Sequence, residues 1–176
     1  QRLRLEVQGG SIVGTTQIND GDWHHVAVVV DDFDNSGITD VDEVKLYVDG
    51  VLETVSGSAS RAINTSGEAI PFIGGSAHAT DCNFKGDIDE LRITNSALSA
   101  TEINTQMVAV NTATELWFPF DETSGASVTE AGGVITGSHS GFSDSETAHI
   151  IGKHGHALTF DGVNDHVSLS GVTVPT

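Results

Sequence analysis

Basic residues are scarce in this chain of 176 residues, which carries 7 lysines and arginines against 25 aspartates and glutamates. The resulting formal net charge of −18 surrounds the protein with a negative field. That field repels the phosphates of nucleic acids and the head groups of anionic membranes, and it attracts cations. The composition therefore excludes a nucleic-acid partner and favours a bound metal ion.

Cysteine is almost absent as well. Cys82 is the single one, so no disulfide can form within the chain. No apolar run approaches the length of a membrane helix, and we expect no membrane insertion. No signal peptide is visible; because the sequence starts inside an expected strand, we expect that processing or trimming removed one. A secreted protein, extracellular or at the cell surface, fits these absences.

Prolines number 3 and aromatic residues make up 6% of the chain, whereas glycine is abundant with 20 residues. Many short strands joined by turns have this composition. Alternating or β-branched segments predict strands at 2–7, 11–16, 23–30, 44–48, 51–55, 70–73, 86–93, 116–120, 156–160 and 166–169. We therefore expect an all-β protein built as an antiparallel β-sandwich.

One segment, 98–107, has the pattern of a helix instead. Ser99 and Glu102 have the spacing of a capping box, in which each side chain bonds the backbone N–H of the other residue. Ile103 and Met107 would form its apolar face. The sequence thus predicts one short helix that packs on the sandwich.

The acidic segment DFDNSGITDVDE, at 32–43, lies between two expected strands. Its spacing matches an EF-hand loop, which places oxygen ligands at positions 1, 3, 5, 7, 9 and 12 and a glycine, here Gly37, at position 6. Glutamate at the last position supplies two oxygens to Ca²⁺. The predicted Ca²⁺ ligands are Asp32, Asp34, Ser36, the carbonyl of Ile38, Asp40 and Glu43.

A solvated acidic hairpin loop is the alternative, because runs of charge are ordinarily exposed. Every ligand position carries an oxygen side chain or a carbonyl, so we favour bound Ca²⁺. Strands rather than helices flank the loop, and the ion would therefore hold a long hairpin together rather than drive a calmodulin-like opening.

Five segments also have a familiar sequence: GDWHHVAVVV at 21–30, KLYVDGVL at 45–52, FKGDIDELRITNSALSATEI at 84–103, LWFPFDETSG at 116–125 and GKHGHALTFDGVNDHVSL at 152–169. Together they resemble the laminin G-like, concanavalin A-like jelly-roll family in its bacterial branch. The resemblance implies a jelly-roll β-sandwich. In that family, however, the last two segments open the domain and the first three close it.

This swapped order divides the chain into a closing-type part at 1–109 and an opening-type part at 110–176. The chain is either a window across two tandem repeats or a rearranged, shortened sandwich. The second part is too short to bury a core alone, so it must close on 1–109 or on a neighbouring chain. We favour closure within the chain, with the strand at 116–120 beside that at 86–93. Completion by a neighbouring copy would instead build filaments or arrays.

The resemblance further implies a structural Ca²⁺ near the junction of the first and last strands. Asp89 looks like one ligand of such a site, and Asp121 could approach it from the opening strand. Asp161 or Asp165 could approach from the FDGVND turn. The alternative is that these aspartates are ordinary turn formers.

Catalytic patterns are missing: there is no serine elbow, no cysteine–histidine pair of note, and no glycosidase signature of alternating carboxylates. We therefore expect no enzyme but a calcium-binding adhesion or structural module, with copies of itself or neighbouring repeats as partners. A carbohydrate-binding, lectin-like module with glycan partners is the alternative. Sugar sites use exposed aromatic rings, and we expect Trp23, Phe72, Trp117 and Phe160 in the core, which favours the first hypothesis.

Overall fold

The computed structural model describes residues 1–57, 61–63, 71–75, 83–108, 116–144 and 148–172. These residues form fifteen β-strands and one helix, α1 (Ala100–Val108). All of their strand pairs are antiparallel. The predicted fold class, all-β and antiparallel with one short helix, is therefore confirmed. Among the described residues, no helix has the length and apolar composition that a membrane crossing requires.

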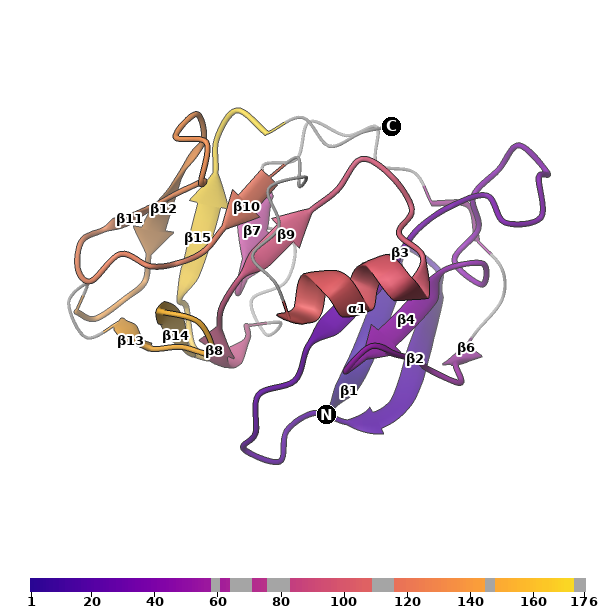
Figure 1. Ribbon diagram of the computed structural model, residues 1–176, viewed down its shortest axis with the longest axis horizontal. Helices are drawn as coiled ribbons and strands as arrows, with labels where there is room; N and C mark the ends of the chain where they lie inside the picture. Colours follow the sequence, from indigo (N-terminus) through magenta and orange to yellow (C-terminus); the bar gives the residue numbers. More distant parts are fainter. Residues whose placement is uncertain (58–60, 64–70, 76–82, 109–115, 145–147, 173–176) are drawn as a thin grey trace. The chain divides into compact units, whose positions relative to one another are not determined.

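By its internal contacts the chain divides into two compact units. Unit 1 comprises Gln1–Thr65 and Ser96–Thr112, and unit 2 comprises Ser66–Asn95 and Ala113–Thr176. Cys82 lies outside the described residues. Figure 1 labels the helix and the strands other than β5 (Val51–Leu52).

Unit 1 contains two three-stranded sheets and helix α1. The first sheet has the order β1 (Arg2–Val7), β2 (Gly10–Gln17) and β6 (Ser56–Gly57). The second sheet has the order β3 (Val26–Val29), β4 (Lys45–Val48) and β5 (Val51–Leu52). The long connection between β3 and β4 is the acidic segment.

Strand β4 lies at the centre of this unit, because both of its faces are covered. Leu46 packs with Ile12 of β2, while its neighbour Tyr47 packs with Val29 of β3 and Ile103 of the helix. Successive side chains of a strand point to opposite faces, so the KLYV sequence contributes to two apolar clusters at once. Strand β4, which follows the acidic segment, is thus firmly anchored.

Helix α1 begins as the sequence predicts. The Ser99 hydroxyl and its backbone N–H both donate to Glu102 Oε2, over 2.7 and 2.8 Å, and the Glu102 N–H donates back to Ser99 Oγ over 3.3 Å. Ile103 is 2% exposed. The capping box is therefore confirmed, and of the predicted apolar face Ile103 is buried whereas Met107 is only partly buried.

Unit 2 contains three antiparallel sheets, each described here by its strand order. A four-stranded sheet joins β11 (Ser127–Thr129), β12 (Thr136–Ser140), β15 (His166–Leu169) and β7 (Phe72–Ile73). A three-stranded sheet joins β13 (His149–Ile151), β14 (His156–Asp161) and β8 (Lys85–Ile88). The pair β10 (Leu116–Phe118) and β9 (Leu91–Ile93) forms the third.

The core of unit 2 draws side chains from all three sheets. Its fully buried members are Phe118, Phe120, Val128, Leu158 and Val167, each 0% exposed. Leu158 comes from the three-stranded sheet, whereas Val128 and Val167 come from the four-stranded one. The two sheets therefore share one core, which is the arrangement of a β-sandwich.

The predicted pairing of strand 116–120 with strand 86–93 is present. Leu116 lies opposite Ile93, and Phe118 lies opposite Leu91. Strand β14 pairs with β8, and β15 pairs with β7. Strands from after residue 115 thus complete sheets that begin before residue 94.

Several strands differ from their predicted extents, and those expected at 51–55 and 116–120 already end at Leu52 and Phe118. The strand expected at 23–30 starts only at Val26, and Trp23, expected in the core, is 39% exposed. The strand expected at 86–93 breaks at Asp89–Glu90. Glu90 has a φ of +56°, and its carboxylate accepts hydrogen bonds from Trp117 Nε1 over 2.9 Å and from Arg92 over 2.6 Å. These two bonds hold Glu90 in the left-handed conformation, which residues other than glycine seldom adopt.

Candidate metal site

The acidic segment between β3 and β4 folds into a compact loop. Gly37, at the predicted turn position, has a φ of +83°, and Asn35 has a φ of +59°. Both values lie in the left-handed region, which glycine and asparagine tolerate better than other residues. The loop therefore makes its sharp turn where the sequence pattern requires it.

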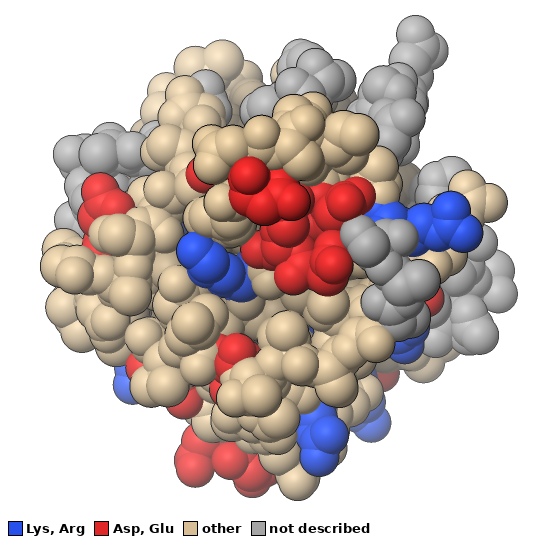
Figure 2. Space-filling model, turned by 90° about the vertical axis from the view of Figure 1, so that its right-hand side faces the viewer, with Lys and Arg blue, Asp and Glu red and all other residues tan. Residues whose placement is uncertain are grey.

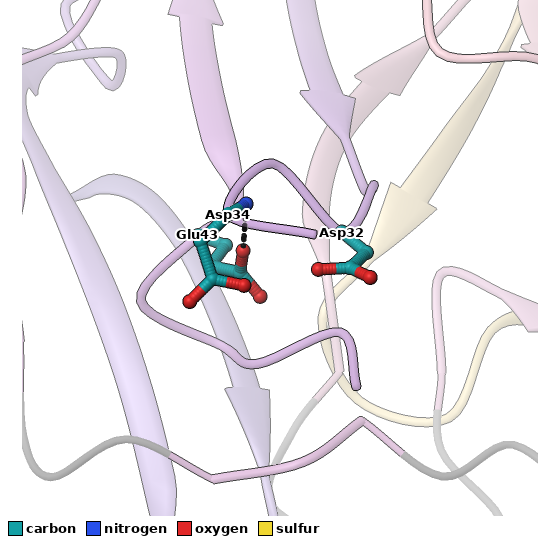
Figure 3. Close-up of side chains that lie close together, drawn as sticks. All are labelled: Asp32, Asp34 and Glu43. Carbon is teal, nitrogen blue, oxygen red and sulfur yellow. Dashed lines mark hydrogen bonds between the residues drawn. The ribbon is translucent and has the colours of Figure 1, made fainter. Parts of the chain in front are cut away.

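Three of the predicted ligands come together in this loop. One carboxylate oxygen from each of Asp32, Asp34 and Glu43 lies within 4.8 Å of the other two. Figure 3 shows the carboxylates of Asp34 and Glu43 close together, with that of Asp32 extending toward them. In the part of the chain that is described, this is the one group of three or more metal-ligating side chains at such distances.

Backbone N–H groups of the loop orient the two aspartates. The Ser36 N–H donates to Asp32 Oδ1 over 3.0 Å and to Asp34 Oδ1 over 2.8 Å, and the Gly37 N–H donates to Asp32 Oδ2 over 2.8 Å. Hydrogen bonds from Ser36 hold the pKa of Asp34 below its ordinary value. Asp34 is thus charged at neutral pH, as a Ca²⁺ ligand must be.

Glu43 closes the loop from its far end. Its Oε1 accepts the Asp34 N–H over 2.9 Å, and its Oε2 accepts the Asp40 N–H over 2.8 Å. Each carboxylate oxygen retains a further lone pair for an ion. The last residue of the segment is therefore bonded to the first half of the loop through Oε1 and to the second half through Oε2.

The other three predicted ligands are not part of the cluster. The Ser36 hydroxyl donates to the Ile38 carbonyl over 3.0 Å, so these two groups satisfy each other. Asp40 instead forms an isolated β-bridge with Ala62 through its backbone. Three carboxylates offer up to six oxygens, which fits the six to eight that Ca²⁺ takes. The three carboxylates are thus compatible with Ca²⁺ without any rearrangement of Ser36 and Ile38.

Residues that the sequence pattern did not reveal anchor the loop. Val41 is 0% exposed, and its N–H donates to the Arg61 carbonyl over 2.8 Å. The Ile63 N–H donates to the Thr39 carbonyl over 2.8 Å. The apolar Val41 within an acidic run was the only sequence signal of this anchor.

Acidic side chains gather on the face of the molecule shown in Figure 2, where Lys or Arg side chains border them.

Asp89 and Asp121, the predicted second site, contact one hairpin turn in unit 2. Asp89 Oδ2 accepts the His154 N–H over 2.8 Å, and Asp121 Oδ1 accepts the His156 N–H over 2.9 Å. Burial raises the pKa of Asp89, and its Oδ1 is buried without a hydrogen-bond partner. The structure brings the two aspartates to the same turn, but no third carboxylate joins them among the described residues.

Asp161 and Asp165 do not belong to that turn. Asp161 ends strand β14, whereas His156, which Asp121 contacts, begins it. A strand of this length separates its ends by roughly 17 Å, so the two groups lie too far apart to share an ion. Asp165 Oδ2 instead accepts the Asp161 N–H over 2.9 Å, which confirms the turn-forming alternative for this pair.

Comparison with known proteins gives one match. The family model described as the concanavalin A-like lectin/glucanases superfamily, Laminin_G_3, matches residues 1–104. This segment is more than half of the chain and spans strands β1 to β9, including the acidic loop. Searches of curated proteins and of solved structures returned no match.

Proposed function

Because the chain belongs to the concanavalin A-like lectin/glucanases superfamily, we propose that it is a calcium-binding adhesion or structural module of an extracellular or cell-surface protein. Domains of this family are generally non-catalytic modules that bind glycans or proteins, and laminin G-like domains are typically extracellular. The family often binds Ca²⁺. Calcium binding by the loop, the adhesive role and self-association go beyond the family and are our proposal.

The observation that carries the calcium proposal is the arrangement of Asp32, Asp34 and Glu43. The three carboxylates would repel one another, yet the loop's own N–H groups hold them together. A divalent cation would relieve that repulsion, and the net charge of −18 would attract it. Ca²⁺ is the ion of choice because every available ligand atom is an oxygen and three carboxylates converge, whereas Mg²⁺ is usually bound through one or two carboxylates and keeps several waters.

Isothermal calorimetry with Ca²⁺ tests the proposal. Glu43→Gln should weaken binding at least about tenfold, since losing a charged ligand costs more than about 1.4 kcal/mol. Asp42→Asn is the matched control: it removes the same charge from the same loop at an exposed position that is not a ligand position. Equal binding by wild type and Glu43→Gln would contradict the site, as would equal losses in both variants.

A second Ca²⁺ beside Asp89 and Asp121 is a separate part of the proposal. It predicts a stoichiometry of two ions, with one of them retained in Glu43→Gln. Asp89→Asn should then remove the remaining ion. If only one ion binds, and Glu43→Gln abolishes its binding, then Asp89 and Asp121 hold the β13–β14 turn and do not bind Ca²⁺.

One observation favours the carbohydrate-binding alternative. Trp23 is 39% exposed, although the sequence placed it in the core, and exposed aromatic rings stack on sugars. A glycan array separates the two roles. Binding that is lost in Trp23→Ala but kept in Val134→Ala, a change at another exposed apolar residue, would establish the lectin role. No binding to any glycan would favour the adhesion role.

A further inference from the structure

A second, looser cluster of metal-ligating side chains, two histidines and a glutamate, lies within unit 2; their donor atoms are not all within 4.8 Å of one another. His139 lies on β12 and His149 lies on β13, so they come from different sheets. Their ring centres are 5.6 Å apart. Glu122 lies in the segment between β10 and β11, and its charge acts on His139.

Four of the six polar side-chain atoms in this cluster are buried and lack partners, whereas His149 Nε2 lies 3.4 Å from the Gly125 carbonyl oxygen and Glu122 Oε1 accepts the Thr129 N–H. Neither ring nitrogen of His139 has a hydrogen bond, and the same holds for His149 Nδ1 and for Glu122 Oε2. Each such atom ordinarily costs about 1–3 kcal/mol, and folded proteins leave few of them. Four in one cluster indicate that the native protein satisfies them with something other than its own chain.

Each of these side chains also contacts the surrounding chain. The Thr129 N–H donates to Glu122 Oε1 over 2.7 Å, which fixes the carboxylate and leaves Oε2 unused. The ring of Phe142 packs against His139 at 4.7 Å and against the core residue Phe160 at 5.4 Å. Burial, followed by the neighbouring His149, lowers the pKa of His139, so its imidazole is neutral.

We propose that His139, His149 and Glu122 bind one Zn²⁺ ion at a site separate from the calcium loop. Imidazole nitrogen and carboxylate oxygen are zinc ligands, whereas Ca²⁺ takes oxygen alone. Two imidazoles on one Zn²⁺, with bonds of about 2.0–2.1 Å, have ring centres about 5–5.5 Å apart, close to the spacing observed. The side chains must still rotate to close on the ion, because their donor atoms are not all within 4.8 Å of one another.

The site would have three protein ligands, which leaves a fourth position for water or for a group of a bound partner. It would also join the four-stranded and the three-stranded sheet of unit 2, through His139 on β12 and His149 on the edge strand β13. Such a link between the sheets would stabilise the unit when metal is bound.

Titration of the intact chain with Co²⁺, in saturating Ca²⁺, tests the site. Tetrahedral cobalt with nitrogen ligands gives strong visible bands, and excess Zn²⁺ should abolish them. One equivalent of Co²⁺ should produce these bands and broaden the imidazole proton signals of His139 and His149 ahead of those of the other histidines. Broadening that spreads over surface histidines alone would overturn the proposal without the need for any variant.

Variants provide the second measurement. His149→Ala and Glu122→Gln should each weaken Co²⁺ binding at least about tenfold. His154→Ala is the matched control, because that exposed histidine contributes only its backbone N–H to the β13–β14 turn. Circular dichroism of each metal-free variant establishes that it is folded. Folded His149→Ala that keeps full cobalt affinity would show that buried water, not metal, satisfies these atoms.

Discussion

His24 is held between two carboxylates, in a stretch where the sequence suggested only a strand. Its Nδ1 lies 2.8 Å from Asp49 Oδ2, and its Nε2 lies 3.1 Å from Asp20 Oδ1. The hydrogen bonds with Asp49 and then with Asp20 raise the pKa of His24 above its ordinary value of 6.5. Asp49 Oδ1 also accepts the His25 N–H over 2.9 Å, so one aspartate fixes the start of β3.

This arrangement predicts how stability depends on pH. A histidine whose pKa is raised in the folded state contributes stability that is complete below its unfolded pKa and is lost as pH rises through the folded one. The melting temperature should therefore fall as the pH rises from about 6.5 through the raised pKa of His24 in the folded state. His24→Gln should flatten that slope, whereas the exposed His154→Gln should leave it unchanged. A slope that persists in His24→Gln would assign the dependence to another group.

Helix α1 packs on β3 and β4 through Ile103, and its first turn depends on the capping box. Ser99→Ala removes the hydroxyl that accepts the Glu102 N–H. The free energy of unfolding should fall by about 1 kcal/mol, the usual cost of a lost N-cap. Urea unfolding measures this, with Ser170→Ala as a control at an exposed position outside the helix. A loss close to zero would mean that Glu102 alone suffices to cap the helix.

Elements with a strong local pattern were predictable, and those set by distant contacts were not. The alternation in 2–7 and 166–169 gave strands with the observed bounds, and the capping box gave the helix. Strands β11 and β13 have only three residues each and carry no periodicity to detect. The break at Glu90 depends on Trp117, twenty-seven residues away in the chain.

The acidic loop shows the same difference between local patterns and distant contacts. Spacing alone identified Asp32, Asp34 and Glu43, because the turn at Gly37 is a local property. Spacing could not show that the Ser36 hydroxyl bonds the Ile38 carbonyl, nor that the backbone of Asp40 bridges to Ala62. Such choices among polar partners depend on the packing of residues 61–63 beside the loop.

The molecule as a whole is strongly acidic, yet one edge strand has an apolar row. Strand β3 lies at the edge of its sheet in the described part of the chain, and Val26 and Val28 are 43% and 42% exposed. An exposed edge with apolar side chains is a template for pairing with another strand. We therefore retain the proposal that copies of the chain associate, through this edge or by exchange of residues 110–176.

Light scattering with and without Ca²⁺ tests association. Charge repulsion at −18 opposes contact between copies, so Ca²⁺ or added salt should raise the average mass. Val28→Lys places a charge on the edge strand and should lower that mass, whereas Val134→Lys, at an 87% exposed position in unit 2, should not. A monomer at high concentration with Ca²⁺ present would contradict self-association.

The pairing of β7 with β15 has a consequence for the order of folding. Ile73 pairs with Val167, and Leu91 pairs with Phe118. The strands synthesised first therefore remain without a partner until the later strands have been synthesised. With roughly ninety residues between the first pair and synthesis at about 5–20 residues per second, β7 stays unpaired for several seconds or more. Long-range antiparallel closure is also intrinsically slow. Unit 2 is thus the part of the protein that most needs protection by a chaperone before its last strand arrives.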